Sequence, residues 1–389
     1  MKKIVFLHLR GNTFGGVYNV DHNLSLEFIK RGYEVHFIAI RDYSIEKAPF
    51  CDPNIIYHIV NENAKWGFTK GTEIISSLKR FMLIKTIKLY LKRIHELKEL
   101  SRDFKKTKKL IKTIDPNYII SSHYQLLNAI SEDYLDKTIN VNHASFELSK
   151  ENKNISKTYT KYKDKIFKFV WLTENAMKTA ISYGYTNSTF IYNAVRFSSI
   201  DVADVVNNKK LITLTRMSDP LKRIDLLIKI ADEILDKSSE WILEIYGNGV
   251  VNEESKTIIN NNSKIKIMGI TDDPKNVYLN ASINLNTSSS EGFCLAIVEA
   301  SECGLPTVTF NFGEATKEVV INNKTGLVIE NDDINQYIKK LKWLMNNDNE
   351  LIILSSGAKE YNNNFSLDKI ITKWLELFKE VDNRNEMKQ

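Results

Sequence analysis

The sequence contains few of the residues that build cross-linked proteins. Only three cysteines occur in 389 residues, too few for a disulfide framework, and we expect a reducing, cytoplasmic setting. No run of 18 or more apolar residues is present, so we expect no membrane-spanning helix. The first apolar run, Ile4 to Leu9, is short and contains His8, which predicts a buried strand rather than a signal peptide.

Metal-binding patterns are also missing. His123 and His143 each follow a predicted strand, but neither belongs to a Glu-x-x-His spacing. The chain has no convincing Asp-x-Asp pair, because Asp201 and Asp204 stand three apart in a predicted linker. We therefore expect no metal site and no bound cofactor. Either histidine can contact a ligand at the sheet edge or be a hydrogen-bonded structural residue.

The composition that is present fits a globular protein of two domains. Hydrophobic residues make up 43% and charged residues 26% of the chain, and the length suits two units of about 190 residues. The charge is unevenly divided: residues 1–200 hold 32 Lys and Arg against 19 Asp and Glu, whereas residues 201–389 hold 22 against 29. The basic half predicts an anionic partner.

Apolar runs and amphipathic stretches alternate twice along the chain. In the first half, strands are predicted at 4–9, 35–40, 117–122, 138–142, 165–173 and 188–192, whereas 41–72 looks irregular. After the polar stretch 198–209 the pattern restarts, with strands predicted at 210–215, 241–246, 264–268, 281–287 and 306–310. This predicts two doubly wound, Rossmann-like α/β domains facing a cleft, with boundaries at 1–197, 198–365 and a final helix in 366–389.

A loop with two adjacent glycines follows the first strand. Gly15 and Gly16 stand at the carboxyl end of that strand, where open α/β sheets bind ligands and where bare backbone amides can face an anion. The loop is not G-x-G-x-x-G, which argues against a plain dinucleotide site. An ordinary β-α turn explains the loop equally well.

The segment 73–113 is helical in pattern and strongly basic. Apolar residues recur at three- and four-residue steps, which predicts one or two amphipathic helices with a cationic face. Such a face fits contact with an anionic membrane surface, and it also fits a solvated helix. A nucleic-acid partner is not expected, because no recognised nucleic-acid-binding module is present.

Two acids, Glu291 and Glu299, stand eight residues apart after a predicted strand. A helix starting near Gly292 would separate them by about 12 Å along its axis. Its first-turn amides would lie between them and could bind an anion, which suits a nucleotide-diphosphate sugar. Two solvated acids beside an ordinary turn are the alternative. The amides concerned belong to Gly292, Phe293, Cys294 and Leu295.

Four residues together, Arg216, Lys222, Glu291 and Glu299, give the chain a resemblance to the retaining glycosyltransferases of group 1 (family 4), which have the GT-B fold. Other pieces occur in the family's order: Gly15-Gly16-Val17, His143 after a strand, Tyr192-Asn193-Ala194-Val195, and Gly247-Asn248-Gly249. Two positions depart from the family's pattern. Ala194 replaces a usual glycine, and Cys294 stands where glycine or proline is common.

The resemblance implies roles for these residues. Arg216 and Lys222 would bind the diphosphate, with the glycine loop and the amides near Gly292 to Leu295 nearby. His143 and Glu291 would contact the transferred sugar, and Glu299 the ribose. Transfer would retain the anomeric configuration without a metal, the departing phosphate accepting the acceptor's proton. The final helix would cross back onto the first domain.

The activity expected from this resemblance is transfer of a hexose or N-acetylhexosamine from a nucleotide sugar, a UDP-sugar for preference. The acceptor would be lipid-linked or polymeric, in cell-surface polysaccharide biosynthesis at the inner face of the plasma membrane. Two alternatives stay open: a soluble acceptor such as a teichoic-type polymer, a protein or a small metabolite, or an inactive GT-B-like binding subunit.

Overall fold

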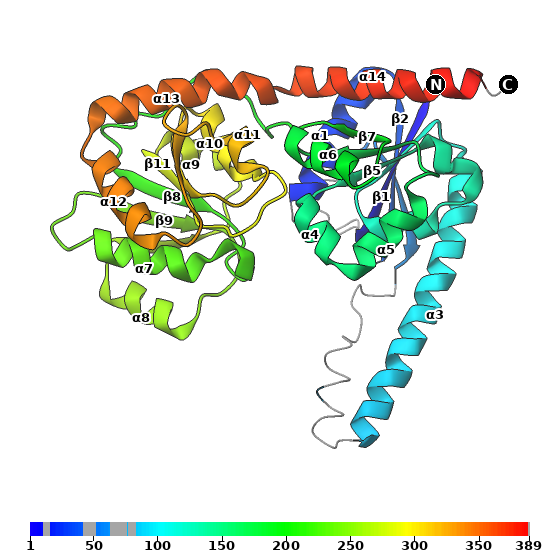
Figure 1. Ribbon diagram of the computed structural model, residues 1–389, viewed down its shortest axis with the longest axis horizontal. Coiled ribbons are helices and arrows are strands. Elements are labelled where there is room, and N and C mark those ends of the chain that lie inside the picture. The colour runs from blue at the N-terminus through cyan, green and yellow to red at the C-terminus, as the bar shows by residue number, and fades with distance from the viewer. Residues whose placement is uncertain (11–15, 42–51, 63–75, 77–82, 388–389) are drawn as a thin grey trace.

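The computed structural model describes residues 1–10, 16–41, 52–62, 76 and 83–387. These residues form two α/β domains that lie side by side, each built on its own parallel sheet (Figure 1). A run of helices along one edge of the molecule spans both domains (Figure 1). The first sheet ends at Phe190 and the second begins at Lys210.

The first domain contains a seven-stranded sheet in the order β3-β2-β1-β4-β5-β6-β7, with every neighbouring pair parallel. The apolar run from Ile4 to Leu7 is completely buried, as a central strand covered on both faces requires. The strands are β1 (Lys3–Arg10), β2 (Glu34–Arg41), β3 (Ile56–Asn61), β4 (Tyr118–Ser121), β5 (Thr138–Asn142), β6 (Lys168–Trp171) and β7 (Ser188–Phe190).

The edge strand β3 corrects one sequence-based interpretation. The stretch 41–72 looks irregular in sequence, yet Ile56–Asn61 pairs with β2. Ile56 is exposed and the rest of the strand is half-buried, so the apolar alternation that reveals a strand is weak. Residues 42–51 and 63–72 lie outside the described part of the chain.

Helices cover both faces of the first sheet (Figure 1). One buried cluster joins β1 to α1 and to the last helix of the chain, and another joins the opposite face to α3, α5 and α6. The helices are α1 (Gly16–Lys30), α3 (Leu83–Ile114), α4 (Phe146–Glu151), α5 (Lys153–Tyr162) and α6 (Glu174–Ser182), with short 3-10 turns at Tyr124–Ala129 and Glu132–Lys137.

The second domain contains a six-stranded parallel sheet in the order β10-β9-β8-β11-β12-β13. Its strands are β8 (Lys210–Leu214), β9 (Ile242–Tyr246), β10 (Ile265–Gly269), β11 (Ile283–Asn286), β12 (Thr307–Phe310) and β13 (Gly326–Ile329). Its helices are η4 (Pro220–Lys222), α7 (Ile224–Ile234), α8 (Glu253–Asn261), α9 (Pro274–Leu279), α10 (Leu295–Glu302), α11 (Thr316–Val319), α12 (Ile334–Met345) and α13 (Asp348–Asn362). Both expected doubly wound domains are therefore confirmed.

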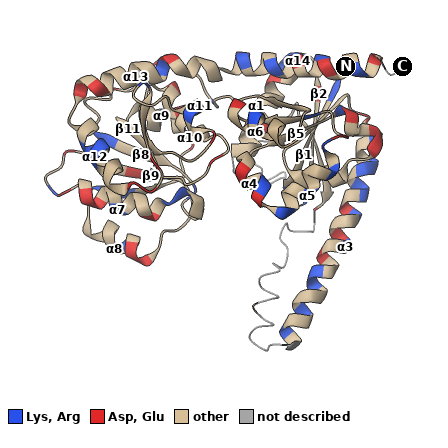
Figure 2. Ribbon diagram, viewed as in Figure 1, with Lys and Arg blue, Asp and Glu red and all other residues tan. Residues whose placement is uncertain are grey.

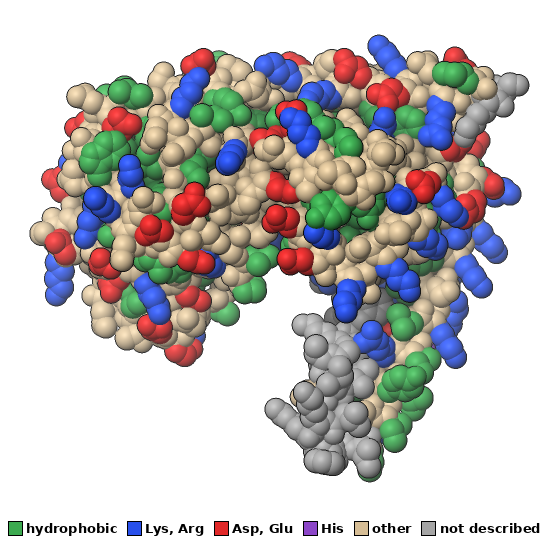
Figure 3. All heavy atoms as spheres, in the orientation of Figure 1, with side chains coloured by type: hydrophobic (Ala, Val, Ile, Leu, Met, Phe, Trp, Pro, Cys, Tyr) green, Lys and Arg blue, Asp and Glu red, His purple; other side chains and the backbone are tan. Residues whose placement is uncertain are grey.

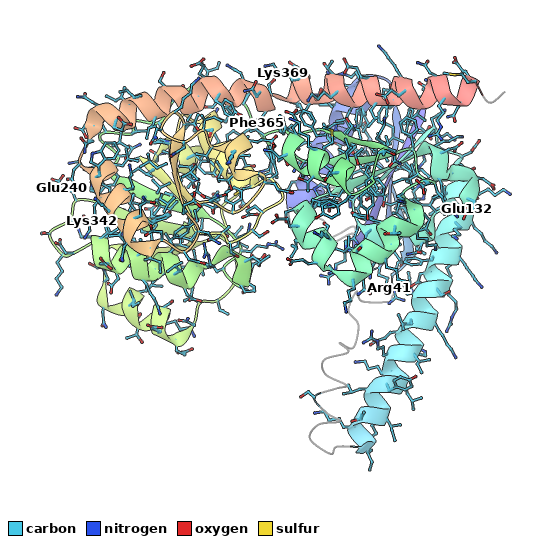
Figure 4. All side chains as sticks on the ribbon, viewed as in Figure 1. Arg41, Glu132, Glu240, Lys342, Phe365 and Lys369 are labelled. Carbon is cyan, nitrogen blue, oxygen red and sulfur yellow. The ribbon has the colours of Figure 1, made fainter. Side chains whose placement is uncertain are left out.

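The last helix, α14 (Leu367–Glu386), returns to the first domain after the short turn η5 (Asn363–Phe365). Phe365 marks this junction, above the point where the domains meet (Figure 4). Phe378 stacks on Tyr118 with ring centroids 4.1 Å apart, and Trp374 meets Phe28 edge-on. The expected crossing of the final helix is confirmed, because its apolar stripe completes the core of the first domain.

The long helix α3 is anchored at one half and projects at the other (Figure 1). Its carboxyl-terminal half packs on the sheet and carries the fully buried Asp103. The Arg41 guanidinium donates to Asp103 at 2.7 Å, and the Asn61 amide donates to the other oxygen at 3.0 Å (Arg41 is labelled in Figure 4). From residue 83 to residue 113, the predicted basic segment is one continuous helix.

Candidate functional site

The predicted site residues of the two domains meet where their loops approach each other. A Cβ added to Gly292 would lie only 2.1 Å from the carbonyl oxygen of His143, so the two backbones are in direct contact. A Cβ on Gly16 would lie 3.4 Å from Cδ1 of Leu295. Four of the predicted residues, two from each domain, therefore gather at one place. Gly15 lies outside the described residues.

The loop after β11 is held by the turn that contains Lys222. The Thr287 hydroxyl donates to the Lys222 carbonyl at 3.0 Å, and the Ser289 amide donates to the Leu221 carbonyl at 2.8 Å. Within the loop, the Ser288 hydroxyl donates to Glu291 Oε1 at 2.6 Å. These contacts fix the Glu291 carboxylate beside the loop that follows β8.

Lys222 and Glu291, which the sequence placed in one site, form an ion pair. Both side chains are largely buried, with exposed fractions of 20% and 11%. Burial opposes the lysine's charge, but the carboxylate of Glu291 outweighs it, so the pKa of Lys222 is raised. The ammonium group therefore stays charged and close to the surface, where it can exchange its carboxylate partner for a phosphate.

Arg216 lies on the same side of the second domain but is more open. Its side chain is 66% exposed, and Nη2 lies 3.2 Å from Asp219 Oδ2. Asp219 also caps the turn at Pro220–Lys222 by accepting from the Leu221 amide. The two predicted diphosphate-binding cations therefore lie close together in sequence. Lys222 is paired with Glu291, whereas Arg216 is mostly exposed and paired with Asp219.

Helix α10 begins later than the sequence predicts. A start near Gly292 was expected, but the helix runs from Leu295 to Glu302. Cys294 has φ +66°, a left-handed conformation that the interior of an α-helix cannot contain, so it ends the loop and caps the helix. Gly292 and Phe293 consequently belong to the loop. The Cys294 thiol accepts from the Asn286 amide at 3.1 Å, and burial raises the thiol pKa, so the sulfur stays protonated.

Phe293 is a packing residue of the domain junction. Its ring is buried and lies 5.7 Å from that of Tyr192 and 5.5 Å from that of Phe365. The backbone of this residue remains next to the site, whereas its side chain joins the first domain, the second domain and the turn before α14. The loop that carries Glu291 is therefore attached to the junction itself.

Glu299 is almost fully buried and already has a partner. The guanidinium of Arg196 donates from Nε to Oε1 and from Nη2 to Oε2, the latter at 2.7 Å. Arg196 follows the last strand of the first domain, and sequence reasoning did not single it out. Contact between Glu299 and a ribose stays a prediction, and it requires this pair to open.

The first-domain wall of the site contains a buried polar cluster that the sequence revealed only in part. His143 was expected there, and His8 at the end of β1 and Asp21 on α1 join it. The Ser122 hydroxyl donates to Asp21 Oδ2 at 2.6 Å, and His8 Nε2 lies 3.7 Å from the same oxygen. A histidine at the carboxyl end of the central strand was a signal for His8, whereas Asp21 is hidden in an amphipathic helix.

Burial sets the charge of this cluster. It lowers the pKa of His8 to about 3, with a smaller contribution from His143. It lowers the pKa of His143 to about 4, with a contribution from His123, whose own pKa burial lowers to about 4. It raises the pKa of Asp21 to about 7, against the opposing hydrogen bond from Ser122. The histidines are therefore neutral at physiological pH.

Two acids of the second domain cap helices of the first. Glu318 accepts from the amides of Glu174 and Asn175, each at 2.8 Å, and from the Tyr192 hydroxyl at 2.9 Å. Glu314 accepts from the Phe146 amide at 3.2 Å. Carboxylates suit helix N-termini, where backbone amides lack partners, so these contacts hold the two domains in one relative orientation.

The fold and site together define a class of protein: two facing parallel-sheet domains, with cations and acids at the junction and a final helix crossing back, are the GT-B arrangement. Residues 199–361 match the family model of the glycosyl transferases group 1. The second domain therefore resembles the group 1 glycosyltransferases.

Relatives and solved structures extend this similarity to the rest of the chain. An uncharacterized glycosyltransferase of Haemophilus influenzae is 25% identical over 96% of this chain and 99% of its own. The poly(ribitol-phosphate) alpha-N-acetylglucosaminyltransferase of Staphylococcus aureus is 32% identical over 41% of this chain and 33% of its own, so this chain matches about a third of that relative. A structure of a Staphylococcus aureus TarM mutant with Fondaparinux, alpha-GlcNAc-glycerol and UDP has the same fold, with 18% identity, a TM-score of 0.74, and 97% and 100% of the two chains covered.

Two features are absent from the residues that the structure describes. No helix in the described ranges is long and apolar enough to cross a bilayer. No group of three or more His, Cys, Asp or Glu side chains within those same ranges is arranged to hold a metal ion.

Proposed function

We propose that this glycosyltransferase moves a hexose or N-acetylhexosamine from a UDP-sugar to a polymeric or lipid-linked acceptor of the cell surface, with retention of the anomeric configuration. The observation that carries the proposal is the Lys222–Glu291 pair, buried at the junction within reach of both domains. The TarM structure, which contains UDP, supports UDP as the nucleotide part of the donor.

The chemistry follows from the charges at the junction. Breaking the bond between the anomeric carbon and the phosphate oxygen adds one negative charge to the two that the diphosphate of a UDP-sugar already carries. Lys222 and Arg216 neutralise that charge, and the amides near the start of α10 add the positive end of a helix. These groups fill the role that a divalent ion plays in other enzymes, so no metal is required. Glu291, released from Lys222, accepts hydrogen bonds from the sugar hydroxyls.

Retention follows from transfer on the face that the phosphate leaves. The acceptor O–H bond breaks, its proton passes to a phosphate oxygen, and the acceptor oxygen bonds to the anomeric carbon as the sugar–phosphate bond breaks. His143 lies beside Gly292 and is neutral, so it donates a hydrogen bond to the sugar rather than a charge. No covalent intermediate on the protein is needed.

The donor half of this proposal is tested by hydrolysis of UDP-N-acetylglucosamine and UDP-glucose in the absence of acceptor. Lys222→Ala and Glu291→Gln are expected to lower the rate of UDP release by roughly 10²-fold or more, since each removes a charge that acts on the transition state. Lys229→Ala is the matched control, because Lys229 pairs with Glu254 on an outer helix at 2.8 Å. Undiminished UDP release by the Lys222 and Glu291 variants would remove these assignments.

For the acceptor, we propose that the enzyme works at an anionic membrane surface through α3. The projecting half of this helix carries mostly Lys and Arg among its charges (Figure 2). It also leaves large apolar side chains open: Ile84 is 74% exposed, and Ile87 and Leu91 are each 58% exposed. Hydrophobic side chains are visible along this arm in Figure 3. An exposed apolar stripe flanked by lysines is the composition of a helix that lies in a membrane interface.

Vesicle co-sedimentation tests the membrane contact. The enzyme should bind vesicles that contain phosphatidylserine, and binding should weaken with salt. Lys85→Glu with Lys88→Glu should abolish that binding. Lys339→Glu with Lys340→Glu, on the exposed face of α12, makes the same change in net charge and should not. Equal binding by both double variants would refute the role of α3.

A soluble polyanionic acceptor is the second candidate, supported by the name of the staphylococcal relative, which acts on poly(ribitol-phosphate). The basic rows of α3 suit a phosphate polymer as well as a headgroup. Binding of poly(ribitol-phosphate) to the enzyme without vesicles, lost in the Lys85 and Lys88 double variant, would favour this candidate over the membrane.

A further inference from the structure

The pair between Arg196 and Glu299 joins the linker, which is residues 191–209 between the two sheets, to helix α10. It is bidentate, and Glu299 is only 2% exposed. Arg196 lies between the last strand of the first sheet and the first strand of the second. Its side chain is 31% exposed, so the arginine reaches solvent while its partner does not. The Arg196 side chain therefore covers a buried carboxylate and separates it from solvent.

Helix α10 contacts the linker a second time, one turn after Glu299, through a hydrogen bond to Glu302. Glu302 accepts from the Ser199 amide at 2.7 Å and from Lys359 Nζ at 3.2 Å. Lys359 also donates to the Glu302 carbonyl at 2.6 Å, which ties α13 to the same point. At its other end α10 continues from the loop that carries Glu291. Helix α10 therefore connects the loop that carries Glu291 to the linker.

A buried carboxylate needs hydrogen-bond donors at both oxygens, and Arg196 is what supplies them. The Tyr278 hydroxyl is buried beside the pair and has no hydrogen-bond partner among the described residues. If Arg196 leaves, Glu299 has to gain two other donors. A ribose offers two adjacent hydroxyls, which can present two O–H donors to one carboxylate as the guanidinium presents two N–H donors.

We propose that Arg196 is an autoinhibitory latch: it occupies Glu299 until the ribose hydroxyls of the donor displace it, and the exchange frees the linker from its first attachment to α10. The inference rests on the proposed function, because it takes Glu299 as the ribose contact. The hydrogen bond from the Ser199 amide to Glu302 persists during the exchange, so the linker stays attached to α10 at this point. Donor binding is in this way coupled to the relative position of the two domains.

The latch makes a quantitative statement about affinity. A protein whose binding-competent state is partly populated binds its ligand more weakly by that fraction. Replacing Arg196 therefore strengthens UDP binding, whereas replacing Glu299 weakens UDP binding. A purely structural pair predicts weaker UDP binding when either partner is lost, because each loss disturbs the same buried site, so the Arg196 variant distinguishes the two cases.

Calorimetric titration with UDP and with 2′,3′-dideoxy-UDP separates these outcomes. Arg196→Gln should bind UDP roughly 5- to 100-fold more tightly than the wild type, the usual range of coupling between sites. Its affinity for the dideoxy nucleotide should be unchanged, since that ligand has no hydroxyls for Glu299. Glu299→Gln should bind UDP more weakly and lose most of the preference for UDP over the dideoxy form. Weaker or unchanged UDP binding by Arg196→Gln overturns the latch.

Two controls keep the test decisive. Arg31→Gln removes an arginine paired with Glu27 on the first domain and should leave UDP binding unchanged. If Arg196→Gln does not fold, Arg196→Lys keeps the compensating charge but offers no bidentate contact, and it should still bind UDP more tightly than the wild type. A wild-type enzyme that fails to bind UDP refutes the proposed donor, whereas wild-type binding with the wrong sign in the variants refutes the latch alone.

Discussion

At the residue scale, the two walls of the site differ in charge: the second-domain wall is charged and the histidines of the first-domain wall are neutral. On the second domain, Lys222 and Glu291 form a largely buried ion pair, and the carboxylate raises the pKa of Lys222. On the first domain, His8 and His143 are neutral, and Asp21 has no basic residue in a hydrogen-bonded pair with it among the described residues. In the proposed function, the donor's phosphates would meet charge on one side, and its sugar would meet neutral hydrogen-bonding groups on the other.

Asp21 should make the stability of the protein depend on pH. Its pKa is about 7 in the folded state, above the ordinary value of 3.8, so the folded state binds the proton more tightly than the unfolded state. The free energy of unfolding contributed by this group is therefore lost as pH rises from about 4 to about 7. Asp21→Asn should become more stable relative to the wild type as pH rises from 5 to 7, and the difference should level off by pH 8.

Urea unfolding at four pH values across that range checks this prediction. Asp368→Asn is the matched control, since it makes the same change in net charge at a carboxyl that is 94% exposed. A difference between Asp21→Asn and the wild type that stays constant from pH 5 to pH 8 would contradict the prediction.

The sequence predicts those site residues that have a fixed spacing along the chain. Lys222 stands six residues after Arg216 and Glu299 stands eight after Glu291, and both spacings are visible without a structure. The structure confirms that Lys222 and Glu291 meet. Arg196 and Asp21 are different, because their importance comes from one distant partner each, Glu299 and Ser122, which no local pattern connects.

At the element scale, the sequence predicts buried strands well and boundaries less well. Strands such as β1 are runs of apolar residues because helices cover both faces, whereas half-buried β3 carries no such run. The start of α10 was missed because a single left-handed residue, Cys294, decides it. The stripe of α14 was visible in sequence, since five of its apolar residues recur at helical spacing.

Helix α14 is expected to contribute strongly to the stability of the first domain. Trp374 is buried against Phe28, and truncating a buried tryptophan leaves a cavity. Trp374→Ala should lower the free energy of unfolding by about 3–5 kcal/mol. Trp343→Ala on α12, where the ring is 42% exposed, should cost much less. Denaturant titrations of both variants make the comparison, and equal losses would argue against a docked α14.

At the scale of the whole molecule, hydrogen bonds, buried apolar packing and one close backbone approach join the two domains. Glu318 and Glu314 cap helices across the boundary, Phe293 packs into it, and Gly292 brings one backbone against the other. The first domain supplies the neutral wall of the site and the second domain supplies the charged wall. The site is therefore complete only while the two domains keep this relative position.

Gly292→Ala should separate the domains. Its added methyl group would overlap the His143 carbonyl, and a backbone atom cannot move aside as a side chain can. We expect donor hydrolysis to fall at least tenfold while the domains themselves remain folded, as circular dichroism would report. Gly16→Ala is the matched comparison for folding, since its methyl group meets a flexible leucine methyl at 3.4 Å. Full activity of Gly292→Ala would mean that this approach is not needed for catalysis.

The docking of α14 has a consequence for how the protein is made. Phe28 and Tyr118 leave the ribosome early, but the helix that covers them comes after the entire second domain. At about 5–20 residues per second, roughly 20 to 70 s pass before Phe378 follows Phe28 out of the exit tunnel. During that interval the nascent first domain presents an uncovered aromatic face. Chaperone binding to stalled chains should therefore persist until the last twenty or so residues emerge, and then end abruptly.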